Sequence, residues 1–145
     1  MLDTKSRFSP AHLILPATYS ADSTPPAVDL QGFNSCLILL SIGVGGITFT
    51  GTNKIEFVLT HSDDNSTYTN VALADVLLDT LGPAAVTNGI VRSLIAAHAS
   101  PTVQRIGYVG GKRYLKFLAD FSGTHGTGTP IDAIALRGHP MVAPV

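Results

Sequence analysis

The side chains best suited to metal binding or nucleophilic attack are present in this chain, but their spacing matches no known constellation. The five histidines are His12, His61, His98, His125 and His139. They form no HxxxH-type pair, and Cys36 is the single cysteine, so no zinc-ligand spacing is present. No serine lies in a GxSxG elbow, and Cys36 falls inside a strand-like apolar run, where a thiol is usually buried and inert.

Two further segments invite a ligand-binding interpretation. The glycine-rich loop at 43–52 lacks both the Lys-Ser/Thr pair of a P-loop and the dinucleotide fingerprint. The run Asp63-Asp64-Asn65 lacks the central glycine and distal glutamate of an EF-hand loop, and its residue types favour a turn. The two paired carboxylates of a glycosidase site would have to come from Glu56 and the aspartates, and most of these aspartates fall in predicted turns. We therefore predict no catalytic, cofactor-binding or metal-binding residues and expect that the chain is not an enzyme.

The segment from Val103 to Phe121 is the clearest structural pattern. Two β-prone runs flank Gly110-Gly111, a pair typical of two-residue hairpin turns. The predicted register places Ile106 opposite Leu115 and Arg105 opposite Lys116. Because side chains alternate across a strand, one face should carry Tyr108, Ile106, Leu115 and Phe117 toward the core. The other face should carry Arg105, Lys112, Tyr114 and Lys116, and this like-charged strip indicates a nearby carboxylate, either from this chain or from a neighbouring molecule, of which we favour the second.

Composition limits the classes of function. The chain has 145 residues, of which 45% are hydrophobic and 13% charged, with a net charge of −1. Low charge indicates either an unusually large core or surfaces covered in an assembly, and the second is favoured for a chain of this size. The near-zero net charge argues against nucleic-acid binding, and no apolar run is long enough for a membrane span. A lone cysteine and the lack of a signal-peptide core predict synthesis in a cytoplasm.

The first 26 residues are expected to form an extended arm. Prolines at 10, 16, 25 and 26 interrupt regular structure, while Leu2, Phe8, Leu13 and Ile14 are too apolar for a free tail. Such an arm lies either across its own domain or across a neighbouring subunit. We predict that residues 27–145 form a single domain.

Strand-like runs and turn signals alternate along that domain. Strands are expected near 27–30, 33–43 with both faces covered, 54–62 paired with 67–71, and 131–138. The segment 86–97 is expected to be a strand, with a short helix as the alternative. Residues 72–81 have helical spacing and predict at most one short helix. The pattern predicts an all-β fold, an antiparallel β-sandwich or jelly roll of seven to eight strands.

The order AVDLQGFNS, THSDDNSTYTNVA, VQRIGYVGGKRYLKF and AIALRGHPMVAPV resembles small structural proteins of tailed bacteriophages, described as head decoration, cement or minor capsid proteins. The most specific pieces are IGYVGGKRY (106–114) and RGHP (137–140). The resemblance implies a virion protein on the capsid surface that stabilises the lattice, with the major capsid protein and further copies of itself, as a dimer or trimer, as partners. It carries no catalytic residue and no cofactor.

Two alternatives remain at this point: a tail or connector structural protein, and a host-surface or carbohydrate-binding β-sandwich module. The residues expected at a subunit or capsid interface are Leu2, Phe8, Leu13, Ile14, Arg105, Lys112, Tyr114 and Lys116.

Overall fold

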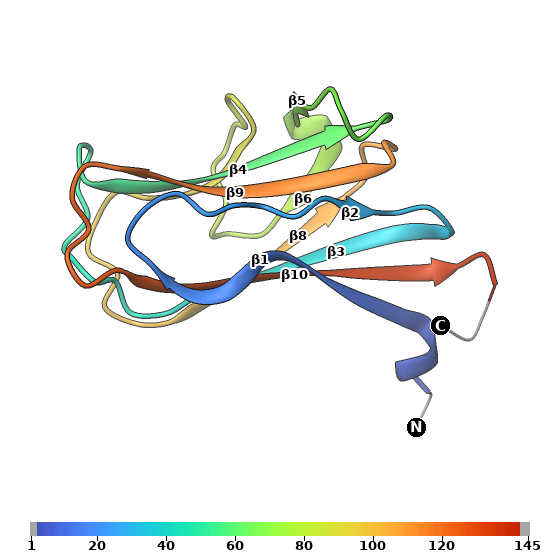
Figure 1. Cartoon of the computed structure of the whole chain (residues 1–145), viewed down its shortest axis with the longest axis horizontal. Helices are drawn as coiled ribbons and strands as arrows, with labels where there is room; N and C mark the ends of the chain where they lie inside the picture. The colour runs from blue at the N-terminus through green and yellow to red at the C-terminus, as the bar shows by residue number, and fades with distance from the viewer. Residues whose placement is uncertain (1–2, 143–145) are drawn as a thin grey trace.

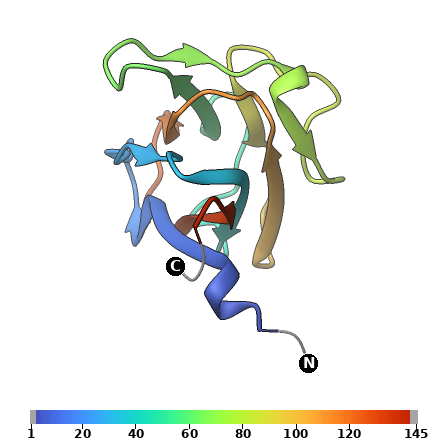
Figure 2. The same cartoon turned by 90° about the vertical axis from the view of Figure 1, so that its right-hand side faces the viewer.

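Two antiparallel five-stranded sheets pack face to face in the computed structural model, which describes residues 3–142. Sheet A has the strand order β1 (Phe8–Tyr19), β10 (Thr129–Pro140), β3 (Phe33–Ile42), β8 (Thr102–Tyr108) and β6 (Val76–Leu78). Sheet B runs β2 (Val28–Asp29), β9 (Tyr114–Ser122), β4 (Lys54–Ser62) and β5 (Thr69–Asn70), with β7 (Ile90–Leu94) also paired to β4. Figure 1 shows β10 in the lower layer and β4 and β9 in the upper, and Figure 2 shows the layers from the end.

The predicted all-β antiparallel sandwich is confirmed, although it has ten strands rather than seven to eight. Its two helical segments are single 3-10 turns, Lys5–Arg7 and Leu73–Asp75. Of residues 72–81, for which at most one short helix or an ordered connection was expected, only Leu73–Asp75 are helical, because Val76 leaves this 3-10 turn to pair with Tyr108 in sheet A. The carboxylate of Asp75 accepts the Ala72 N–H at 2.8 Å, which fixes this short turn.

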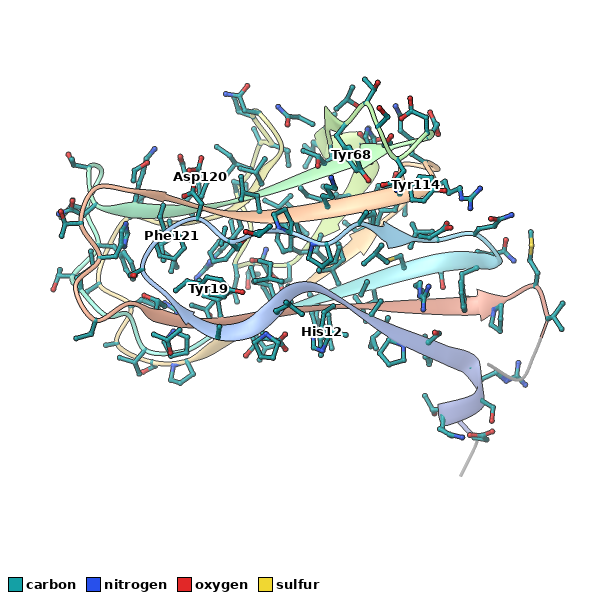
Figure 3. The ribbon with its side chains drawn as sticks, viewed as in Figure 1. His12, Tyr19, Tyr68, Tyr114, Asp120 and Phe121 are labelled. Carbon is teal, nitrogen blue, oxygen red and sulfur yellow. The ribbon has the colours of Figure 1, made fainter. Side chains whose placement is uncertain are left out.

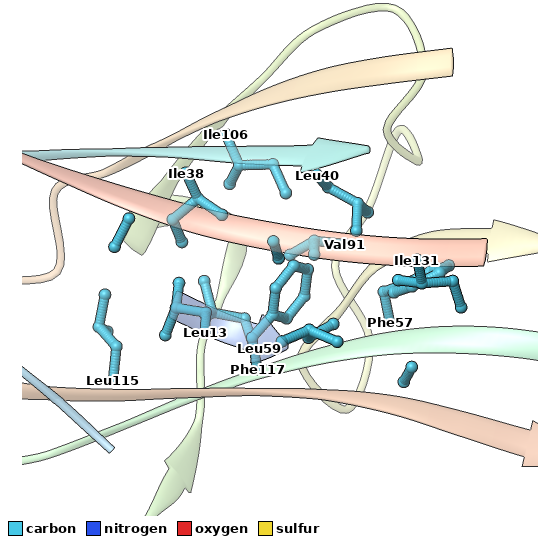
Figure 4. Packing of buried hydrophobic residues seen from close by; sticks show 14 of the residues in the cluster. Leu13, Ile38, Leu40, Phe57, Leu59, Val91, Ile106, Leu115, Phe117 and Ile131 are labelled. Carbon is cyan, nitrogen blue, oxygen red and sulfur yellow. The ribbon is translucent and has the colours of Figure 1, made fainter. Parts of the chain in front are cut away.

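The core lies between the sheets and follows from period-two alternation of apolar residues. Every second residue of β4, β8 and β9 is buried, including Phe57 and Phe117, whose ring centroids lie 6.1 Å apart. Figure 4 shows side chains of both sheets meeting in this layer. Full burial of one such side chain contributes about 1.5–3 kcal/mol. The strand β3 also alternates, so the expectation that both of its faces are covered is wrong.

The N-terminal segment does not form a separate arm. Residues 8–19 are the edge strand β1, and Leu13 and Ile14 are buried in the core of the same chain. Register shifts on either side of Ile14 explain how two consecutive side chains both face inward. Pro10 and Pro16 are tolerated because β1 is an edge strand, where one row of N–H groups has no ladder partner.

The hairpin predicted over 103–121 is also wrong. The strands β8 and β9 belong to different sheets, so the connection at 109–113 crosses from one layer to the other. Gly111 has φ +72°, and the Val109 N–H donates to the Asp75 carbonyl at 2.8 Å. The predicted core face is correct, since Ile106, Tyr108, Leu115 and Phe117 are all buried. Both a hairpin and a crossing need glycine and inward apolar residues, so the sequence pattern does not distinguish them.

Candidate functional site

The outer face of sheet A carries an unusual concentration of apolar side chains. Alternation turns these side chains outward because their strand neighbours, such as Ile38, Ala135 and Ile106, are buried. We call this surface the apolar face, and it is formed by Leu37, Leu39, Leu77, Val103, Ile134 and Leu136. Leu77 is 65% exposed and Val103 59%.

Strand register aligns these residues in rows across the sheet. Leu37 pairs with Leu136 on one side and with Gly107 on the other, and Gly107 pairs with Leu77. A Cβ on Gly107 would lie 3.2 Å from Cβ of Leu77, so the side chain of Leu77 leans over this glycine. The row is therefore continuous from β6 to β10. In the next row, Leu39 pairs with Ile134 and with Arg105.

Few charges border the apolar face. The backbone N–H of Arg105 donates to Oδ2 of Asp79 at 2.9 Å, while its side chain is exposed. On the opposite side, Nδ1 of His12 lies 3.3 Å from Oδ1 of Asp132. His12 lies on the underside of β1 in Figure 3. One margin of the face thus carries the Arg105 side chain beside the Asp79 carboxylate, and the other carries Asp132 with His12.

The second notable surface lies on sheet B and consists of two cation–aromatic pairs. Nζ of Lys116 is 4.3 Å from the ring centroid of Tyr68, and Cζ of Arg113 is 4.8 Å from that of Tyr114. Burial, and then the neighbouring Tyr114, raises the pKa of Tyr68. Figure 3 shows the two tyrosines near each other on the upper layer. We call Tyr68, Arg113, Tyr114 and Lys116 the cation–aromatic patch.

A hollow of about 550 Å³ lies at one end of the sandwich, lined by Phe33, Cys36, Tyr108 and Lys112 among others. Burial raises the pKa of the Cys36 thiol to about 12, so at neutral pH it is protonated and a poor nucleophile. The predicted buried, structural role of Cys36 is confirmed by its 5% exposure.

The two most specific pieces of the sequence resemblance meet at this end. Arg137 pairs with Cys36 on β3, and Cys36 pairs with Tyr108 on β8. The Arg137 guanidinium lies over Phe33 and donates to the Ser9 hydroxyl at 2.7 Å and to the Asp29 carbonyl at 3.0 Å. Arg137 therefore ties β1, β2 and β3 together, which is a structural role.

The predicted interface residues do not form one surface. Leu2 lies outside the described residues. Leu13 and Ile14 are core residues, which corrects their assignment to an interface, and Phe8 packs beside Gly138 at the start of β1. Arg105 and Lys116 lie on different sheets, so the expected like-charged strip is not present.

The remaining predicted residues do lie near one another, and each already has a partner. Lys112 is 3.6 Å from the Asp63 carboxylate. Tyr114 and Lys116 belong to the cation–aromatic patch, in which Arg113 also bonds both oxygens of Asp29, at 2.9 and 2.7 Å. The sequence alone does not reveal the apolar face, because the apolar run at 36–42 is equally typical of a strand covered on both sides. The signal for it is the outward leucine or isoleucine at every second position, in β3 (Leu37, Leu39) and β10 (Ile134, Leu136).

Within residues 3–142, no group of three or more His, Cys, Asp or Glu side chains is arranged to hold a metal ion. The described part of the chain contains no helix of the length and apolarity needed to cross a membrane.

The chain matches no protein-family model, and no curated protein matches it. One similar solved structure is described as the crystal structure of SPBc2 prophage-derived protein YomS. The alignment covers 94% of this chain and 97% of that chain, with 13% sequence identity and a TM-score of 0.49.

Proposed function

We propose that this chain is a virion structural protein that decorates the outside of a bacteriophage head and stabilises the capsid lattice. The observation that carries the proposal is the apolar face of sheet A. The largest apolar patch on a protein surface is often functional, and a patch bordered by polar residues is typical of a protein–protein contact. The low charged fraction of 13% and the sequence resemblance to head decoration proteins support the same role.

A decoration protein acts by burying surface between shell subunits. Apolar surface removed from water contributes about 25 cal/mol per Å². A standard interface buries roughly 1,600 Å² in total. Repetition over many copies on a lattice adds avidity, so modest single contacts suffice.

Attachment to the major capsid protein is assigned in this proposal to the cation–aromatic patch. Tyrosine and arginine are among the residue types enriched at energetically dominant interface positions. Lys116 forms no salt bridge within the described residues, and its side chain is held over Tyr68. A carboxylate on the capsid surface would complete this arrangement.

A carbohydrate-binding module on the host-recognition apparatus is the second candidate. The neighbouring, partly exposed rings of Tyr68 and Tyr114 favour it, because sugars stack on aromatic side chains. Against it, Lys116 and Arg113 already lie over these rings. Glycan binding abolished by Tyr68→Ala would support the second candidate, as would a virion position in the tail.

The proposal is tested on virions made from the genome that encodes the chain. Mass spectrometry of purified virions should detect it, and heads made without its gene should bind the purified protein and become more resistant to heat. Lys116→Glu should weaken this binding, whereas Lys54→Glu, elsewhere on sheet B, should not. Absence of the chain from virions and from heads would contradict the proposal.

A further inference from the structure

We infer that the apolar face of sheet A binds the same face of a second copy, in a two-fold dimer whose axis runs parallel to β3. This inference rests on the proposed function in one respect: that function treats the apolar face as a protein–protein contact, and the inference names the protein as a second copy of this chain. The arrangement leaves the cation–aromatic patch, on the opposite sheet, free to contact a capsid.

The strand order of sheet A places the centre of the apolar face on β3. Leu37 and Leu39 lie on this middle strand, with β10 and β1 on one side and β8 and β6 on the other. A two-fold axis parallel to β3 therefore places Leu37 and Leu39 against the same residues of the second copy. It also keeps the strands of the facing sheets nearly aligned, as in ordinary sheet packing.

The same rotation exchanges the two flanks of the sheet. Each β8 then lies over the partner's β10, in the same row of the register. Leu136 of one copy comes over Gly107 and Leu77 of the other, where the glycine has no side chain to obstruct it. Apolar residues thus meet in the row of Leu37.

Charge complementarity selects this axis over the alternative. Arg105 on β8 comes over Ile134 of the second copy, two residues from Asp132 on the same strand, which is within reach of an arginine side chain. An axis across the strands would instead place Arg105 over β8 of the second copy, near its own equivalent, and like charges there are unfavourable. His12 and Asp79 are the other titratable groups at these margins: His12 lies 3.3 Å from Asp132, and Asp79 accepts the backbone N–H of Arg105 at 2.9 Å.

The size of the face predicts a dimer of modest affinity. The three gaps between its four strands, at about 4.8 Å each, make it about 14 Å wide, and six residues of β3 make it about 20 Å long. This is smaller than the roughly 800 Å² per partner of a standard interface. The dimer should therefore dissociate on dilution.

Sedimentation velocity of the isolated chain across a dilution series tests the inference. The wild type should show a monomer–dimer equilibrium, and Leu77→Lys, at a position already exposed in the fold, should weaken it by about tenfold or more. Arg105→Asp alone and Asp132→Arg alone should each weaken it similarly. When the two variants are mixed, they should form a heterodimer. One copy then has acidic residues at both 105 and 132 and the other has arginine at both, so each contact between positions 105 and 132 again joins opposite charges.

The control is Lys116→Asp, the same reversal on the outer face of sheet B, which should leave dimerisation unchanged. Circular dichroism verifies that every variant is folded. A wild type that remains monomeric at high concentration would overturn the inference, as would variants that fail to restore association when mixed. Neither result contradicts the proposed function, which depends on binding to heads and is measured separately.

Discussion

His61 and Tyr108 join the two sheets through a buried hydrogen bond, with Nδ1 of His61 on β4 lying 3.0 Å from Oη of Tyr108 on β8. The backbone N–H of Lys112 also donates to this hydroxyl at 3.0 Å. The Tyr108 O–H is therefore left to donate to His61, which requires a neutral imidazole. Burial lowers the pKa of His61, in agreement with this arrangement.

Removing the Tyr108 hydroxyl should destabilise the fold. Tyr108→Phe leaves both His61 and the Lys112 N–H without their buried partner, which typically costs about 1–3 kcal/mol of unfolding free energy. Urea denaturation measures this change. The control is Tyr19→Phe, because the Tyr19 hydroxyl donates to the Leu15 carbonyl in an exposed position and its loss should cost less. Equal effects of the two substitutions would show that the buried hydrogen bond between the sheets contributes no more to stability than the exposed one.

Stability should fall as the solution is acidified through the titration of His61. The folded pKa lies below the ordinary value of 6.5, so below pH 6.5 the unfolded chain binds more protons than the folded one. The contribution of His61 is thus fully present above pH 6.5 and is lost as pH falls toward its folded pKa. Urea denaturation at several pH values should show a smaller slope for His61→Gln than for the wild type. An unchanged slope would assign the pH dependence to other groups.

Asp64 should stabilise the turn between β4 and β5 as a carboxylate. Its Oδ1 accepts the N–H groups of Ser66 and Thr67, both at 2.8 Å, and these bonds lower its pKa to about 2. The stabilisation is therefore present above the ordinary value of 3.8 and is lost as pH falls through about 2. Asp64→Ala should lower the melting temperature at neutral pH more than Asp63→Ala, and the difference should shrink in acid. A difference that persists at low pH would contradict this account of the turn.

The crossing between the sheets should depend on Gly111. Its φ of +72° is unfavourable for other residues, and a Cβ there meets no atom within 4 Å, so the strain is purely of the backbone. Gly111→Ala should cost about 1–2 kcal/mol of unfolding free energy. Gly51→Ala is the matched control, since Gly51 is equally open and lacks a positive φ. If both substitutions are neutral by denaturation, the crossing does not impose this conformation.

The sequence predicted the sandwich because alternation at period two is directly readable in β4, β8 and β9. It did not predict which strands pair, since Gly110-Gly111 suits a hairpin and an inter-sheet crossing equally well. The bulged register around Ile14 was equally hidden, because it depends on pairing with β10, far away in the chain. The apolar face also depends on pairing, since Leu37, Leu136 and Leu77 become neighbours only when β3, β10, β8 and β6 share one sheet.

Protection of the apolar face in the assembled particle is the most direct test of the central claim that this face is a protein interface. The native thiol, Cys36, is 5% exposed with a pKa of about 12, so it should give little background with a maleimide reagent. Leu77→Cys probes the face, and Val44→Cys, in a loop and 52% exposed, is the control. Both should react at similar rates in dilute free protein, whereas in particles Leu77→Cys should react far more slowly than Val44→Cys. Equal labelling of the two cysteines in particles would contradict the claim.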